Sequence, residues 1–230
     1  MPRKSFDREL QGLQDDVLVL GSVVEKAIAE AVQALQQQDH KAARDLIARD
    51  RAINEKRYAI EGDALTLIAR QQPLASDLRT IFTVLEIATE LERIGDYAKG
   101  IAKVGVLMDG EHLLKPFAQI PRMADLARRM LQQALEAFVQ RDAALARAIG
   151  AQEQEMDALH NAVYRELLSL ITADPDNVDR ASYLLWVAHN LERTADRVLN
   201  ICERVIFTVT GEMVEMDVEE GEDMGLEALS

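Results

Sequence analysis

Apolar residues recur every three or four positions along almost the whole chain. The pattern is clearest between Leu10 and Leu35, where Leu13, Val17 and Leu20 begin a run of this kind. Such spacing places the apolar side chains on one stripe of an α-helix, with polar residues on the opposite face. The chain is therefore predicted to be built from amphipathic helices that bury their stripes against one another.

Capping residues and prolines divide this pattern into six helices. Asp39 and Asp142 each precede an apolar-periodic segment, as N-cap residues do. Pro73 and Pro175 interrupt the pattern because proline lacks a backbone donor and restricts the residue before it. The predicted helices cover about 10–35, 40–71, 76–108, 122–139, 143–171 and 178–209, with a proline-marked loop at Pro116 and Pro121.

The order of these signals indicates an internal duplication. The caps, the prolines and two similar segments, "LERIGDYAKGI" (Leu91–Ile101) and "LERTADRVLNI" (Leu191–Ile201), recur at offsets of 103, 102 and 100 residues. This is the signature of a repeat. We expect an all-α protein with two tandem three-helix bundles, six long antiparallel helices in all. The first repeat is predicted to cover residues 1–110, and the second to cover residues 111–210.

Composition narrows the class of protein. The 230 residues carry a formal net charge of -14, which argues against nucleic-acid binding. Residues 211–230 hold eight acidic and no basic residues, and we expect them to be a disordered tail. The single cysteine, Cys202, excludes an internal disulfide and fits a reducing cytoplasm. No apolar run reaches the roughly 18 residues of a membrane span, so we expect membrane contact only through partners.

The repeated segments each carry two carboxylates on one helical face. Glu92 and Asp96, like Glu192 and Asp196, are four residues apart, which costs roughly 0.2–0.5 kcal/mol for like charges on an exposed helix. A cation should compensate them. A second residue pair precedes each of these pairs, on the helix before. We call Asp50, Asn54, Glu92 and Asp96 the first-half set, and Glu153, Asp157, Glu192 and Asp196 the second-half set.

Two interpretations of these sets remain open. Four oxygen ligands from two facing helices suit a cation such as magnesium, manganese or iron. Acidic pairs are also common on solvated faces, where nearby bases answer them; the candidates here are Arg93, Lys99, Arg193 and Arg197. The neutral Asn54 makes the first-half set the weaker metal site.

No residue is nominated as catalytic, and we expect no enzyme. The sequence contains no nucleophile elbow, P-loop or Rossmann fingerprint. A ferritin-like metalloenzyme is an alternative, but it needs paired Glu-x-x-His motifs, and His160 after Asp157 gives at most one degraded copy. A metal-free helical adaptor is another alternative. Trp186 is expected in the core.

The segments "ARQQPLASDLRTIFTVLEIATELERIGDYAKGIAK" and "LERTADRVLNICERVI" resemble the signature segments of the PhoU family. The resemblance extends over nearly the whole chain. It implies six helices in two three-helix repeats, and no catalysis. It also implies a metal-ligand role for both sets, with iron, manganese, zinc or magnesium as the ion, although Asn54 departs from the acidic pattern.

The same resemblance implies the partners. PhoU-like proteins link the ATPase subunit of the phosphate ABC transporter to a phosphate sensor histidine kinase. They act as negative regulators that keep the phosphate-starvation response off when phosphate is plentiful. We therefore expect a cytoplasmic regulator of phosphate uptake, and we also expect a homodimer.

Overall fold

The computed structural model describes residues 2–108, 114 and 118–216, and within them it contains helices and no strand. The elements are α1 (Pro2–Gln37), α2 (His40–Gln71), α3 (Ser76–Leu107), α4 (Gln119–Gln140), α5 (Ala143–Ile149), η1 (Gly150–Gln152), α6 (Glu153–Ala173), η2 (Pro175–Asn177) and α7 (Val178–Thr210).

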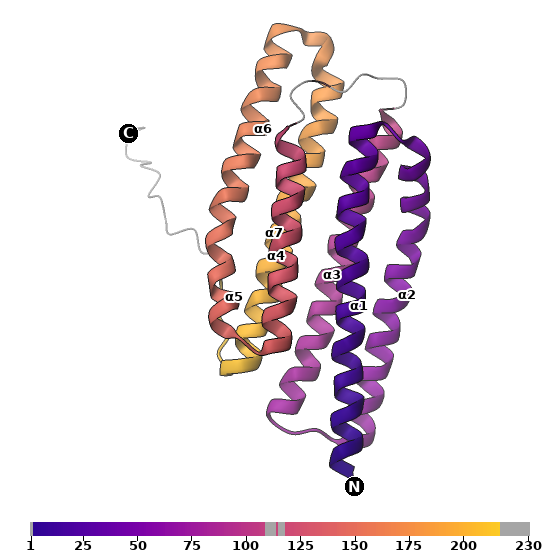
Figure 1. Cartoon of the computed structure of the whole chain (residues 1–230), viewed down its shortest axis with the longest axis vertical. Helices are drawn as coiled ribbons and strands as arrows, with labels where there is room; N and C mark the ends of the chain where they lie inside the picture. Colours follow the sequence, from indigo (N-terminus) through magenta and orange to yellow (C-terminus); the bar gives the residue numbers. More distant parts are fainter. Residues whose placement is uncertain (1, 109–113, 115–117, 217–230) are drawn as a thin grey trace, which may run out of the picture.

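Two three-helix bundles lie side by side (Figure 1). The first consists of α1, α2 and α3, and the second of α4, the α5–α6 rod and α7, with successive long helices antiparallel. The bundles meet where α3 packs against α7 and α1 packs against α4. The predicted all-α duplication is confirmed. The predicted boundary between residues 110 and 111 lies outside the described residues.

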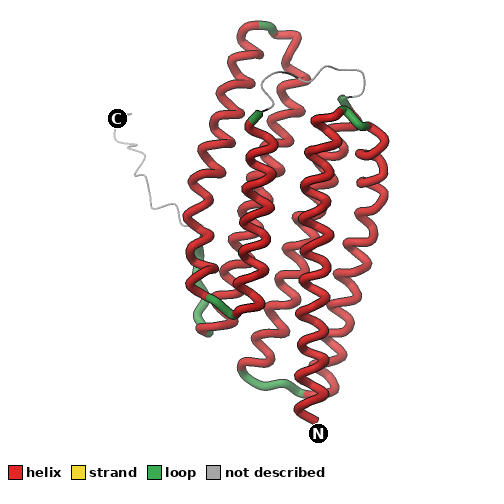
Figure 2. The backbone as a smooth tube through the Cα atoms, in the orientation of Figure 1, coloured by secondary structure: helices red, strands yellow, loops and turns green. Residues whose placement is uncertain are grey.

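The predicted caps and breaks define the helix ends. The Asp39 carboxylate accepts a hydrogen bond from the Ala42 amide at 2.9 Å, and Asp142 accepts from Ala144 and Leu145 at 2.9 Å each. Pro73 lies in the loop between α2 and α3 (Figure 2). Free amides at a helix start need such acceptors, so these residues fix where α2 and α5 begin.

The fifth predicted helix is a rod of three successive pieces, because the short 3₁₀ segment η1 lies between α5 and α6. Gly150 begins η1, and a side chain there would meet the Met216 methyl group at 2.9 Å. The Met216 amide also donates to Glu203 Oε1 at 2.8 Å. Residues 211–216 therefore lie against α7 and η1, while residues 217–230 of the predicted tail lie outside the described residues.

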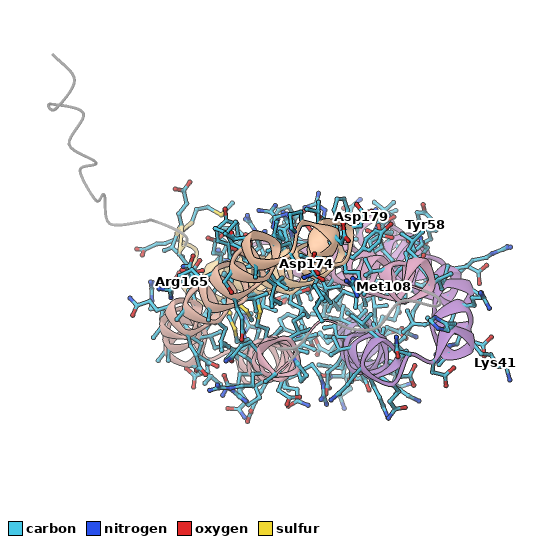
Figure 3. The ribbon with its side chains drawn as sticks, turned by 90° about the horizontal axis from the view of Figure 1, so that it is seen from above. Lys41, Tyr58, Met108, Arg165, Asp174 and Asp179 are labelled. Atoms are coloured by element: carbon cyan, nitrogen blue, oxygen red, sulfur yellow. The ribbon has the colours of Figure 1, made fainter. Side chains whose placement is uncertain are left out.

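The predicted stripes form one continuous core through both bundles. Val17 of α1, Leu91 of α3 and Leu191 of α7 are all fully buried. Viewed from above, the bundle is elongated in cross-section, with Lys41 and Arg165 towards its two ends and Met108 towards the middle (Figure 3). None of the described helices combines the length and the apolar character that crossing a bilayer requires.

Candidate functional site

The first-half set lies where α2 packs against α3. Asp50 is buried on α2, and Asp96 is exposed on α3. The Lys99 ammonium donates to Asp50 Oδ2 at 2.6 Å and to Asp96 Oδ1 at 3.4 Å. Lys99 therefore links the two helices through their carboxylates, and the compensating cation predicted from the sequence is present within the chain.

Close approach of the helices brings these side chains together. A side chain at Gly95 would meet Ile53 Cδ1 at 3.0 Å, so α3 can pack this closely on α2 only with a small residue there. Ala195 stands at the corresponding position of the second half. A small residue therefore stands at this helix contact in both halves.

Glu92 is the member of the first-half set whose ionisation is disfavoured by its surroundings. Burial raises the pKa of its carboxyl, and the charges of Asp96 and Asp50 raise it further, while Arg57 and Arg93 oppose the change. The pKa of Lys99 is also raised, chiefly because Asp50 accepts its hydrogen bond. The repulsion predicted between carboxylates four residues apart therefore acts on Glu92, whereas Lys99 stays charged.

The second-half set lies between α6 and α7, and different side chains contact its carboxylates. Glu192 is flanked by two histidines: His160 Nδ1 lies 3.3 Å from its Oε1, and His189 Nδ1 lies 3.1 Å from its Oε2. Arg193 pairs with Asp196 at 3.1 Å. Since His160 belongs to α6, its contact with Glu192 joins the two helices as Lys99 does in the first half.

The remaining members of the second-half set, Glu153 and Asp157, lie on α6, the first half-buried and the second exposed. Across the ranges 2–108 and 118–216, no three His, Cys, Asp or Glu side chains are grouped so that they could hold a metal ion. Each set thus lies on two facing helices, as predicted. The carboxylates are contacted by side chains of the chain itself: Lys99 in the first-half set, and Arg193 with two histidines in the second-half set.

Two of the four predicted counter-cations have another partner. Arg93 and Arg197 both approach Glu90, at 2.9 and 3.5 Å. Glu90 is buried on α3, and Arg197 belongs to α7, so this acid joins the two bundles. Sequence reasoning missed Glu90 because its partner on α7 is far away in the chain. It also missed His189, whose only signal was its position three residues before Glu192.

A groove of about 600 Å³ opens beside the first-half set, between α3 and α7. Lys99 and Lys103 line it from α3, and Tyr183 and Trp186 line it from α7. The expectation that Trp186 packs in the core is wrong, because its side chain is 61% exposed. The stripe of α7 follows Leu184, Val187 and Leu191 instead. Cys202, by contrast, is buried.

Comparison with known proteins agrees with this architecture in both halves. The family profile described as the PhoU domain matches residues 17–104 and 120–205, one match in each bundle. The chain is 35% identical over 218 residues to a protein of Clostridium acetobutylicum named phosphate-specific transport system accessory protein PhoU homolog. That alignment covers 94% of this chain and 100% of the relative.

Two solved structures have the same fold over nearly their full length. The crystal structure of the phosphate transport system regulatory protein PhoU from Streptococcus pneumoniae matches with a TM-score of 0.85 and 33% identity, covering 91% of this chain and 99% of that one. PhoU from Pseudomonas aeruginosa matches with a TM-score of 0.85 and 31% identity, covering 90% and 100%. With two copies of the domain, its fold and its signature segments all present, this chain belongs to the PhoU family.

Proposed function

We propose that this chain is an accessory protein of a phosphate-specific transport system and regulates phosphate uptake. The observation that carries the proposal is the full-length match, in both bundles, to relatives that are named for this role. Family membership alone gives a fold. Here the similarity reaches 31–35% identity over at least 90% of the chain, which supports a shared role as well.

The proposed mechanism is regulation through binding. The chain contacts the ATPase subunit of the transporter and a phosphate sensor histidine kinase in the cytoplasm, and it keeps the starvation response off when phosphate is plentiful. In this proposal, information about phosphate passes as a change in the affinity of the chain for its partners. We place one partner contact at the groove between α3 and α7, where Trp186 and Tyr183 are the residue types that anchor interfaces.

Metal ions are a further part of the proposal, in the second half. The carboxylates of the second-half set, with His160 and His189, offer the oxygen and nitrogen donors that iron, manganese and zinc take. These side chains are not grouped around a common point, so binding requires them to rotate. A bound ion would neutralise the carboxylates on this face of the protein.

A binding assay with the separate partners tests the proposal. The purified chain is immobilised, and the transporter's ATPase subunit or the kinase's cytoplasmic part is passed over it. We expect Trp186→Ala to weaken binding at least tenfold. Leu65→Ala, which removes an equally exposed (61%) side chain from α2, should leave binding unchanged.

Each result of this assay has a defined meaning. Binding of neither partner by the unmodified chain contradicts the proposed regulation. Equal binding by the two variants places the contact away from the groove. If the Glu192→Gln/Asp196→Asn variant binds its partners and regulates phosphate uptake as the unmodified chain does, a metal-free adaptor is favoured. Oxygen consumption by the iron-loaded protein would favour the ferritin-like alternative.

A further inference from the structure

Lys99 occupies the position that an added cation would need in the first-half set. Its ammonium is 2.6 Å from the buried Asp50 carboxylate and 3.4 Å from that of Asp96. The Lys99 side chain is itself only 25% exposed. An ion bound between these carboxylates would lie against the positive charge of Lys99, and the repulsion between the two cations would oppose binding.

The arginines near the first-half set pair with acids outside it, so Lys99 is the main counter-ion of the set. Arg93 pairs with Glu90, outside the set. Arg57 pairs with Glu61 at 2.6 Å, although its charge still lowers the pKa of Glu92. Lys99 contacts two members of the set, Asp50 and Asp96.

At three corresponding positions the first half carries more positive charge than the second. At a fourth the order is reversed, because Tyr97 stands where the second half has Arg197, but Arg197 pairs with Glu90, outside both sets. At the offset of 103 residues, Asn54 stands where the second half has Asp157, and Arg57 stands where it has His160. At the offset of 100 residues, Lys99 stands where the second half has Leu199, which is buried. The first-half set therefore has three carboxylates and an ammonium group that contacts two of them, whereas the second-half set has four carboxylates, of which Asp196 pairs with Arg193.

We propose that the first-half set is neutralised by the chain itself, with Lys99 in the place of a metal ion, and that any dependence on added cations is confined to the second half. The first part rests only on the contacts of Lys99. The second part rests on the cation binding proposed above for the second-half set.

Replacing Lys99 by Met tests the first part. This change keeps the length of the side chain and removes its charge, leaving Asp50 buried without a counter-ion. In metal-free buffer we expect Tm to fall by roughly 4–8 °C. Adding Mn²⁺ at about 100 times its Kd should recover most of this fall. Lys103→Met, one turn along α3, is the control: Lys103 has no ion pair or hydrogen bond among the described residues and should show neither effect.

A variant of the second-half set distinguishes metal binding by the two halves. In Glu192→Gln/Asp196→Asn the second-half set is disabled, and we expect the otherwise unmodified chain to lose its response to Mn²⁺. Addition of Lys99→Met to this background should restore a response from the first half. Manganese retained after dialysis, measured by mass spectrometry, gives an independent readout. The assay with the ATPase subunit is separate, so its failure would leave this inference standing.

Two results would overturn the inference. One is a Lys99→Met protein that loses stability but gains no response to Mn²⁺. The other is a chain with Lys99 intact whose Mn²⁺ response is abolished by Asp50→Asn. If Lys99→Met does not fold, Asp50→Asn/Lys99→Met removes both charges and should fold without metal and without a metal response; failure of the double variant to fold would also contradict the proposal.

Discussion

At the scale of single residues, α3 carries both a carboxylate that is disfavoured by its surroundings and an ammonium group that neutralises neighbouring carboxylates. Burial raises the pKa of Glu92, and the charges of Asp96 and Asp50 raise it further, while Lys99 binds Asp50 and Asp96. The same helix therefore carries a destabilising carboxylate and a stabilising ammonium. Their effects on stability should have opposite signs and can be measured separately.

Replacing Glu92 by Gln should stabilise the protein at neutral pH. Because the pKa of Glu92 is higher in the folded state than its ordinary value of 4.5, ionisation of this group disfavours folding. That cost is absent below pH 4.5 and is complete once the pH exceeds the raised pKa. We expect a gain of about 0.5 kcal/mol at pH 7, limited by solvent screening, and no gain at pH 3.5.

Urea unfolding at the two pH values measures this difference in metal-free buffer. Glu136→Gln, on the exposed side of α4, is the control and should change stability at neither pH. A Glu92→Gln protein that is less stable at pH 7 would mean that the carboxylate is stabilised by its surroundings, contrary to the direction of its pKa shift.

The thiol of Cys202 should be inert in the folded protein. Its side chain is fully buried, and burial, with a smaller contribution from Glu203, raises its pKa to about 12. Thiolate is the reactive form, so at pH 8 a thiol reagent should label Cys202 only after unfolding in denaturant. Rapid labelling of the native protein would show that this part of α7 opens locally.

At the scale of elements, the helices follow from local signals in the sequence. The apolar period, the Asp39 and Asp142 caps and the breaks at Pro73 and Pro175 act within a few residues, and the predicted ends agree closely with those observed. The N-terminal end of α1 is the exception: the stripe starts near Leu10, but the helix starts at Pro2. The sequence signals did not indicate the short 3₁₀ segment η1, which interrupts the fifth predicted helix at Gly150–Gln152.

Contacts between elements could be predicted only in part. The duplication placed each set on facing helices, and the candidate counter-cations included Lys99. Which acid each base pairs with depends on how α3 packs on α2 and α7, and local spacing does not contain that information. Trp186 shows the same limit, since residue type suggested burial but its angular position on α7 decided exposure.

The N-cap of α5 gives a prediction at this scale. Asp142 accepts two amide hydrogen bonds, so Asp142→Ala should cost about 1 kcal/mol and lower Tm by roughly 2–4 °C. Asp142→Asn retains an acceptor and should lie close to the unmodified protein. Thermal unfolding followed by circular dichroism compares the three proteins; equal losses in both variants would point to the charge of Asp142 rather than to its capping role.

At the scale of the whole molecule, the two bundles are joined by polar as well as apolar contacts. Glu90 binds Arg197 and Asn200 across the contact of α3 with α7. Thr83 and Thr208 share a buried hydrogen bond further along the same two helices. One core runs through both bundles, so we expect the chain to unfold as a single cooperative unit.

Glu90→Gln should weaken this junction. The change leaves the Arg197 guanidinium without its anion in a largely buried place, which should cost about 2 kcal/mol and lower Tm by roughly 4–8 °C. Glu86→Gln, one turn earlier on α3, breaks only a long 3.9 Å pair with Arg204 and should cost far less. Similar losses in both variants would mean that Glu90 has no special role in joining the bundles.

The role in phosphate regulation is tested most directly in the bacterium that carries this chain. A reporter driven by a phosphate-starvation promoter is measured in phosphate-rich medium, with the gene deleted and with the gene restored. We predict high reporter activity in the deleted strain and repression when the chain is restored. Equal reporter activity in the two strains would contradict the proposal that this protein keeps the starvation response off.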